Sequence, residues 1–264
     1  MDIKPPYGYQ EIVPLTKHHK VLLPEVRKLP VVFRNLTALP LSYTEFAMAC
    51  RDYPIAFVSS DGGSTFVGMA VLGMENQQNL FVTAEGGWDP GVYLPAYVRR
   101  YPFCMTRVTV DGREQPERIA CVEKRAINDK GEALYDPKGE PLAVWEERRK
   151  LLFEYEADLV RSDEMARTLA GLGLLETFTM QAVPTQGQPL AMTGMYRVAE
   201  QKLAELAPDT LKDLTQKGIL ARVYAHLISL SNFGRLLDRR AAQQVKPAPA
   251  PAPAPATRER KKTN

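Results

Sequence analysis

Proline placement constrains the fold of this chain more than any other feature of the sequence. Six of the 21 prolines fall at positions 5, 6, 14, 24, 30 and 40, and five more alternate with alanine between residues 247 and 256. Because proline fixes φ and has no backbone N–H to donate, it interrupts helices and the interior of sheets. We therefore expect residues 1 to about 40 to form extended, edge-like structure rather than helix.

The alternating segment KPAPAPAPAPA begins a tail that should be separate from the folded body. Alternating Pro and Ala bury too little apolar surface to offset the ordering of the chain, so we expect residues 246–264 to be disordered or extended. Two interpretations of its basic tip stay open: weak contact with an anionic surface, or a solubilising appendage with no partner. The basic residues are Arg258, Arg260, Lys261 and Lys262.

Charge, cysteine and histidine usage argue against several classes of protein. The last eight residues carry four positive and one negative side chains, which accounts for the whole net charge of +3 among 264 residues. The remainder is formally neutral, so we expect no specific nucleic-acid partner, because such partners need a basic face. Three cysteines and three histidines at unrelated spacings indicate neither a disulfide framework nor a metal site.

The apolar stretches of the chain indicate a cytoplasmic protein. The start, MDIKPPYGYQ, has no apolar run of the kind that a secretory signal carries. The most apolar long stretch, residues 219–237, contains Arg222, His226 and Arg235, which a membrane span would not hold. We therefore expect no transmembrane segment.

The N-terminal half has the patterns of short antiparallel strands. Ser42 and Glu45 form a capping-box pair that predicts a short helix over residues 41–52. Pro95 is typical of the first position of a second short helix, over residues 95–101. About five strands of one sheet are expected at 53–59, 64–74, 79–84, 103–110 and 117–124. Cys104 and Cys121 lie on the two arms of the last hairpin, and two buried thiols are favoured over a disulfide.

The C-terminal half combines helices with one hairpin. Residues 128–141 are typical of a loop rather than a calcium site. Trp145, Leu152 and Leu159 recur every seven residues, which predicts a helix over 143–160, and Ser162 is expected to cap a second helix that ends near Leu172. A hairpin is expected over 176–182 and 190–198, followed by helices at about 198–206, 208–217 and 219–239.

These patterns predict an α+β fold. It has a mostly antiparallel sheet in the N-terminal half, a β-hairpin plus helices in the C-terminal half, and a disordered Pro-Ala tail. Residues 1–245 are expected to form a single domain, with a sub-division near 128–141 as the alternative.

Four segments carry a family resemblance: RDYPIAFV, NLFVTAEGGWDPGVYLPAYVRRYPF, TGMYRVAEQKLAEL and GILARVYAHLISLSNF. In this order and spacing they resemble the SapC-like family of bacterial proteins, over most of residues 10–235. The family takes its name from a locus linked to a bacterial surface layer, and relatives tend to lie near genes for outer-membrane receptors and flavin-dependent halogenases. The resemblance therefore implies an accessory role linked to cell-surface or uptake systems, and it supplies no catalytic residues.

The stretch GGWDPGVYLPAYVRRYPF, residues 86–103, is the strongest candidate for a ligand site. Arginine beside aromatic faces suits a carboxylate, a phosphate or a planar ring, whereas the structural alternative is a packed aromatic corner of the core. His226 is expected on the inward face of its helix, where a hydrogen-bonded packing role is favoured over catalysis. The candidate ligand-binding residues are Trp88, Tyr93, Tyr97, Arg99, Arg100, Tyr101 and His226.

Motif content favours a non-enzymatic accessory or interaction protein with an unidentified protein partner. The sequence holds no nucleophile elbow, phosphate-binding loop, dinucleotide fingerprint or zinc-protease motif, so no cofactor or catalytic residue is expected. The alternative is a binding protein or enzyme that takes an organic anion or planar ligand at the Trp88–Tyr101 segment. Enzymatic activity therefore stays open, with the balance against it.

Overall fold

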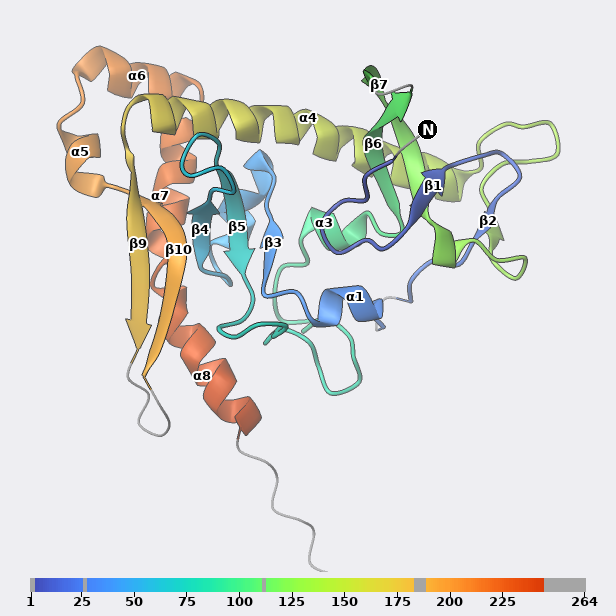
Figure 1. The fold of residues 1–264 in the computed structure, drawn as a ribbon, viewed down its shortest axis with the longest axis horizontal. Helices are drawn as coiled ribbons and strands as arrows, with labels where there is room; N and C mark the ends of the chain where they lie inside the picture. The colour runs from blue at the N-terminus through green and yellow to red at the C-terminus, as the bar shows by residue number, and fades with distance from the viewer. Residues whose placement is uncertain (1–2, 26–27, 111–112, 183–188, 245–264) are drawn as a thin grey trace, which may run out of the picture.

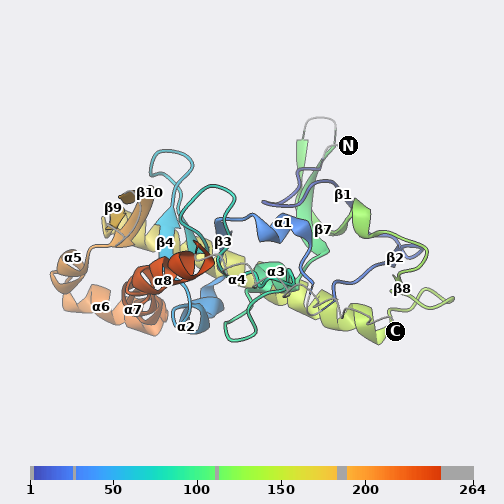
Figure 2. The same cartoon turned by 90° about the horizontal axis from the view of Figure 1, so that it is seen from below.

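The computed structural model describes residues 3–25, 28–110, 113–182 and 189–244 (Figures 1 and 2). Helices and antiparallel sheets are both present, which confirms the α+β class. The predicted Pro-Ala tail and its basic tip lie outside the described residues, so they stay predictions. None of the helices within these ranges combines the length and the apolar character that a bilayer crossing needs.

A five-stranded antiparallel sheet has the order β3-β5-β4-β10-β9. Its strands are β3 (Ala38–Pro40), β4 (Ile55–Val58), β5 (Val67–Val71), β9 (Leu175–Ala182) and β10 (Leu190–Val198). The predicted β4–β5 and β9–β10 hairpins are both confirmed. They also pair with each other, because Tyr196 of β10 lies opposite Phe57 of β4. The two halves of the chain therefore build one sheet.

A second sheet has three strands in the order β1-β7-β6, and a third has two. The strands are β1 (Ile12–Pro14), β6 (Phe103–Val110) and β7 (Arg113–Glu123), with β2 (Lys20–Val21) paired to β8 (Glu132–Ala133). The β6–β7 hairpin is confirmed, and it places Cys104 directly opposite Cys121 as two buried free thiols. The expectation that this hairpin shares a sheet with β4 and β5 is wrong.

Residues 79–84 do not form the predicted strand. Only an isolated bridge joins Val82 to Trp88. The backbone groups of this segment are taken locally: the Asn79 side chain accepts from the N–H of Phe81, and Phe81 O accepts from the N–H of Asp89. The segment therefore forms a turn that brings Phe81 beside Trp88 rather than an edge strand.

One long helix, α4 (Ala143–Gly171), replaces the two predicted helices. Ser162 does not cap a new helix, because its hydroxyl donates to the carbonyl of Asp158 one turn earlier, at 2.8 Å. The helix ends as expected, since Gly173 adopts a φ of +65° and the Leu174 N–H returns to Leu169 O. In Figure 1, α4 runs from the β6–β7 hairpin to the β9–β10 hairpin, and it contacts both β5 and β6.

The remaining helices are short. They are α1 (Val31–Arg34), η1 (Tyr43–Glu45), α2 (Phe46–Ala49), α3 (Ala96–Arg99), η2 (Lys124–Ala126), α5 (Glu200–Ala204), α6 (Pro208–Gln216), α7 (Ile219–Ser229) and α8 (Asn232–Gln244). The Ser42–Glu45 capping box is confirmed. Helix α1 contradicts the expectation of a helix-free N-terminal segment, because Pro30 starts a helical turn without losing a bond.

The predicted helix over 219–239 is divided into α7 and α8. The side-chain amide of Asn232 donates to the carbonyls of Cys50 and Tyr53, at 2.8 and 3.0 Å, which fixes the start of α8 against the segment after α2. Helix α7 contacts β4 and β10, and α7 and α8 lie together on one face of the five-stranded sheet (Figures 1 and 2).

Apolar side chains form a larger and a smaller core. The larger one lies around the five-stranded sheet and holds Phe46, Tyr53 and Phe57. The smaller one packs Phe103 against Trp145, with ring centroids 5.0 Å apart, and is closed by Leu152. Helix α4 enters both cores, and it also borders the site described next.

Candidate functional site

Trp88 is a core residue rather than an exposed ligand platform. Its side chain is buried, and its Nε1–H donates to the hydroxyl of Tyr53 at 2.9 Å. The indole lies nearly parallel to the ring of Phe81, with an interplanar angle of 13°. Its polar group is satisfied and its faces are packed, so the first half of the aromatic segment stabilises the larger core.

Tyr93 and Arg99 pair with each other at the surface. The Tyr93 hydroxyl donates to Glu45 Oε1 and accepts from Arg99 Nη2, both at 3.1 Å. Burial raises the pKa of Tyr93 to about 12. Glu45 also accepts the backbone N–H of Ala96 at 2.6 Å, so it fixes the start of α3. Glu45 therefore positions α3, and Tyr93 and Arg99 are hydrogen-bonded beside it.

His226 joins two strands of the sheet. It is fully buried on α7, where Nδ1–H donates to Ile55 O at 2.8 Å and Nε2 accepts from the Val198 N–H at 3.1 Å. Burial lowers its pKa to about 4, so the imidazole is neutral at neutral pH. Both ring nitrogens are occupied by backbone groups, and His226 lies outside the lining of the cavity described below.

Tyr97, Arg100 and Tyr101 point inward from α3 and the turn after it. Tyr101 packs its ring against Tyr9 and Phe33, with centroids 5.4 and 5.3 Å away. The Tyr97 hydroxyl donates to the carbonyl of Tyr7 at 2.6 Å. Of the seven predicted ligand-binding residues, Tyr97 and Arg100 line a common cavity, whose lining does not include the other five.

This cavity, called here the Arg100 cavity, lies between α3, α4 and the β6–β7 hairpin and has a volume of about 370 Å³. Among the described residues, its lining carries a single carboxylate, that of Glu156 on α4. The cationic side chains are Lys4, Arg100, Arg107 and Arg118. The cavity wall therefore has an excess of positive charge, which favours an anionic occupant.

Arg100 is a buried cation held between aromatic rings. Its side chain is 4% exposed, and its guanidinium carbon lies 4.2 Å from the ring centre of Tyr97 and 4.7 Å from that of Tyr155. Burial disfavours its charge, but the surrounding tyrosines outweigh this and raise the pKa of Arg100 above its ordinary value. Its Nε has no hydrogen-bond partner among the described residues.

Glu156 is the matching acidic group, and it satisfies Arg100 incompletely. Its Oε1 lies 4.0 Å from Arg100 Nη1 and has no hydrogen-bond partner in the described part of the chain, while Oε2 pairs with Arg118. Burial raises the pKa of Glu156 in spite of Arg118 and Arg100. An unsatisfied buried polar group costs about 1–3 kcal/mol. A ligand oxygen that accepts from Arg100 Nε would remove such a cost.

Sequence reasoning identified two of the residues that line this cavity, Tyr97 and Arg100. It selected Arg99 and Arg100 together, but one turn of helix places Tyr97 and Arg100 inside and Arg99 outside. It missed Tyr155 and Glu156 on α4. Their spacing of three and four residues from the predicted core position Leu152 is the signal that would have placed them on the inner face.

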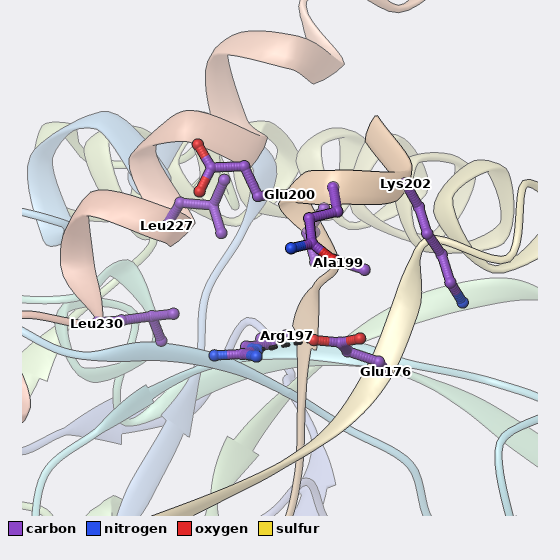
Figure 3. A pocket seen from close by; sticks show the side chains of 9 residues that line it. Glu176, Arg197, Ala199, Glu200, Lys202, Leu227 and Leu230 are labelled. Carbon is purple, nitrogen blue, oxygen red and sulfur yellow. Dashed lines mark hydrogen bonds and ion pairs between the residues drawn. The ribbon is translucent and has the colours of Figure 1, made fainter. Parts of the chain in front are cut away.

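A second cavity of about 500 Å³ lies between the β9–β10 hairpin, α5 and α7 (Figure 3). The cations here have partners: Arg197 Nε donates to Glu176 Oε1 at 2.9 Å, and Lys202 Nζ donates to Gly173 O at 3.1 Å. Leu227 and Leu230 form the opposite wall. Two carboxylates, Glu176 and Glu200, balance the two cations of this lining, so the cavity attracts an anion less than the Arg100 cavity does.

No group of three or more His, Cys, Asp or Glu side chains in the described ranges is placed to hold a metal ion. The family model described as SapC matches residues 15–236. No curated protein and no solved structure matches the chain.

Proposed function

Because this chain belongs to the SapC family, we propose that it is a non-enzymatic accessory protein that binds an organic anion in the Arg100 cavity. In this proposal it acts in the cytoplasm with an unidentified protein partner. The cavity lining provides cations and tyrosine rings, which bind and orient a ligand.

The observation that carries the proposal is the environment of Arg100. Its two faces are covered by Tyr97 and Tyr155, so a ligand meets the N–H donors along the edge of the guanidinium. Burial raises the pKa of Tyr97 to about 12, so this ring stays neutral beside the cation. A planar guanidinium edge matches a carboxylate or phosphate better than any other group. The unsatisfied Nε–H then donates a hydrogen bond to an oxygen of the ligand.

The test is calorimetric titration with benzoate and hexanoate as probes. Wild-type protein is expected to bind both, and Arg100→Gln is expected to weaken binding at least about tenfold, because a charge-assisted bond to a buried cation is lost. Arg99→Gln is the matched control, since it removes an exposed arginine from the same helical turn and should leave affinity unchanged. Circular dichroism checks that the Arg100 variant is folded.

Arg118→Gln gives an independent measurement, because Arg118 is half-exposed and its loss does not leave a hole in the core. We expect it to weaken binding less than Arg100→Gln does. Failure of the wild-type protein to bind either anion, or equal loss of affinity in the Arg99 and Arg100 variants, would contradict the proposal.

A further inference from the structure

A second hollow of about 530 Å³ adjoins the Arg100 cavity on the outer side of α4. The two share Arg107, Arg118, Glu156 and Leu159 in their linings, so they form one continuous groove. The inner end holds the buried cation Arg100, and the two shared arginines mark the junction. The groove is therefore cationic at its inner end and at the junction.

The outer hollow has apolar side chains exposed to solvent. Phe153 is 55% exposed and Val160 is 66% exposed, and both line the hollow. They lie seven residues apart on α4, so they share a face, about 10 Å apart along the helix axis. Exposed large apolar side chains beside a cationic pocket are typical of a site for a ligand with two kinds of surface. We call Phe153, Leu159 and Val160 the α4 shelf.

We propose that the ligand is an amphipathic carboxylate whose head group binds Arg100 and whose apolar chain lies along the α4 shelf. This inference rests on the proposed function and specifies its ligand class. Charge sets the orientation, because the cations cluster at the inner end and the junction, while Phe153 and Val160 lie beyond them. A chain of about eight carbons is comparable in length with the two helical turns of the shelf.

The test is titration of wild-type protein with unbranched carboxylates of increasing chain length, from butyrate to decanoate. Affinity is expected to rise about two- to fourfold per added methylene, because each one removes apolar surface from water, and to level off at about eight carbons. Alkylamines of the same lengths are the probe controls and should not bind, since the cavity wall is cationic. Equal binding of the amines would overturn the inference.

Two variants separate the head from the chain. Phe153→Ser should flatten the chain-length dependence and leave butyrate affinity unchanged. Arg100→Gln should lower the affinity of every carboxylate by a similar factor and preserve the dependence. Val31→Ser is the matched control, because Val31 is 67% exposed on α1, away from the groove lining.

The outcomes distinguish this inference from the proposed function. If short anions bind and the chain-length dependence is flat in wild-type protein, the amphipathic ligand is wrong and anion binding stands. If no anion binds, both are wrong. If sedimentation shows a dimer that Phe153→Ser dissociates, the shelf is an interface between two copies of the chain rather than a ligand surface.

Discussion

The side chain of His226 bridges backbone groups of β4 and β10 that do not bond to each other directly. The register of β4 and β10 places Tyr196 opposite Phe57, so Val198 falls opposite Ile55. The imidazole lies between these two residues and bonds to Ile55 O and to the Val198 N–H. This requires the neutral ring with its proton on Nδ1, because Nε2 must accept. This link between β4 and β10 therefore depends on the protonation state of one residue.

We predict that His226 makes the stability of the protein fall in mild acid. The folded state holds the His226 pKa at about 4, below the usual value of about 6.5. The stabilisation is present above about pH 6.5 and is lost as pH falls toward 4, and its size is on the order of 3 kcal/mol. His226→Gln removes the titrating ring and keeps one donor and one acceptor in the side chain. Urea unfolding of the two proteins between pH 7 and 4 should show a growing deficit in the wild type, and parallel curves would contradict it.

Glu156 should make anion binding stronger as the pH falls, whereas His226 makes the folded protein less stable. It faces Arg118 from β7, Arg100 from α3, and Arg107 and Lys4 across the cavity, with Asp163 on its own helix. Burial raises its pKa, so it becomes protonated at a higher pH than an ordinary glutamate. Protonation removes the carboxylate that competes with a bound anion.

We predict that a sulfonate probe, which stays ionised, binds more tightly as pH falls through the Glu156 pKa. Glu156→Gln should bind the probe roughly three- to tenfold more tightly at neutral pH, as expected for removal of one partly screened like charge. It should also lose the pH dependence. Calorimetry of both proteins at several pH values decides the matter, and a variant that binds more weakly than wild type would assign Glu156 to ligand binding instead.

At the scale of elements, α4 determines where the site can form. It supplies Tyr155 and Glu156 to the Arg100 cavity and Phe153 to the shelf, all within four consecutive residues. The end of this helix depends on backbone conformation alone, because a Cβ at Gly171 or at Gly173 would meet no atom within 4 Å. Gly171 is the last helical residue, whereas Gly173 has a φ of +65°.

These two glycines give a matched pair of substitutions. Gly173→Ala is expected to destabilise the protein by about 1 kcal/mol, because an L side chain is strained at positive φ. Gly171→Ala is expected to be neutral or to stabilise by up to about 1 kcal/mol, because alanine favours the helix. Urea denaturation measures both. If the Gly171 variant loses as much stability as the Gly173 variant, steric contact of the added Cβ rather than the backbone φ causes the loss.

The elements also show what a sequence can predict. The hairpins, the capping box and the helix at Pro95 follow from signals within a few residues, and the structure confirms them. The prediction that Ser162 caps a second helix was wrong. Serine can cap a helix or bond back to a carbonyl within one, and packing of the whole α4 face decides between the two. The strand predicted at residues 79–84 does not form, because a side chain and a turn bond to the backbone N–H and C=O groups that strand pairing would use.

Long-range pairing escaped prediction for a different reason. Nothing in the β4–β5 or β9–β10 hairpin specifies which free edge the other hairpin joins. The candidate site was only partly predicted, for the same reason. Tyr97 and Arg100 are close in sequence and were found, whereas Tyr155 and Glu156 reach the cavity from a helix more than fifty residues later.

At the scale of the whole molecule, one helix connects two cores. Helix α4 gives Trp145 and Leu152 to the smaller core and Met165 and Leu169 to the larger one. The single domain predicted for residues 1–245 requires these cores to unfold together. The two tryptophans of the chain report them separately, because Trp88 lies in the larger core and Trp145 in the smaller one.

We predict coincident unfolding of the two cores. The variants Trp88→Phe and Trp145→Phe each leave one tryptophan. In each variant, the urea midpoint measured by fluorescence should equal the midpoint measured by circular dichroism. Resolved transitions, with Trp145 changing at lower urea concentration, would support the alternative sub-division near residues 128–141.

The position of β10 between β4 and β9 also bears on synthesis at the ribosome. Strand β5 follows β4 directly in the chain, but the other neighbour of β4 begins only at Leu190. While the intervening residues are translated, at roughly 5–20 per second, one edge of β4 has no partner strand. Such an edge pairs readily with other nascent chains. The C-terminal third is therefore the part whose arrival closes the sheet, and slow translation before Leu190 prolongs the aggregation-prone interval.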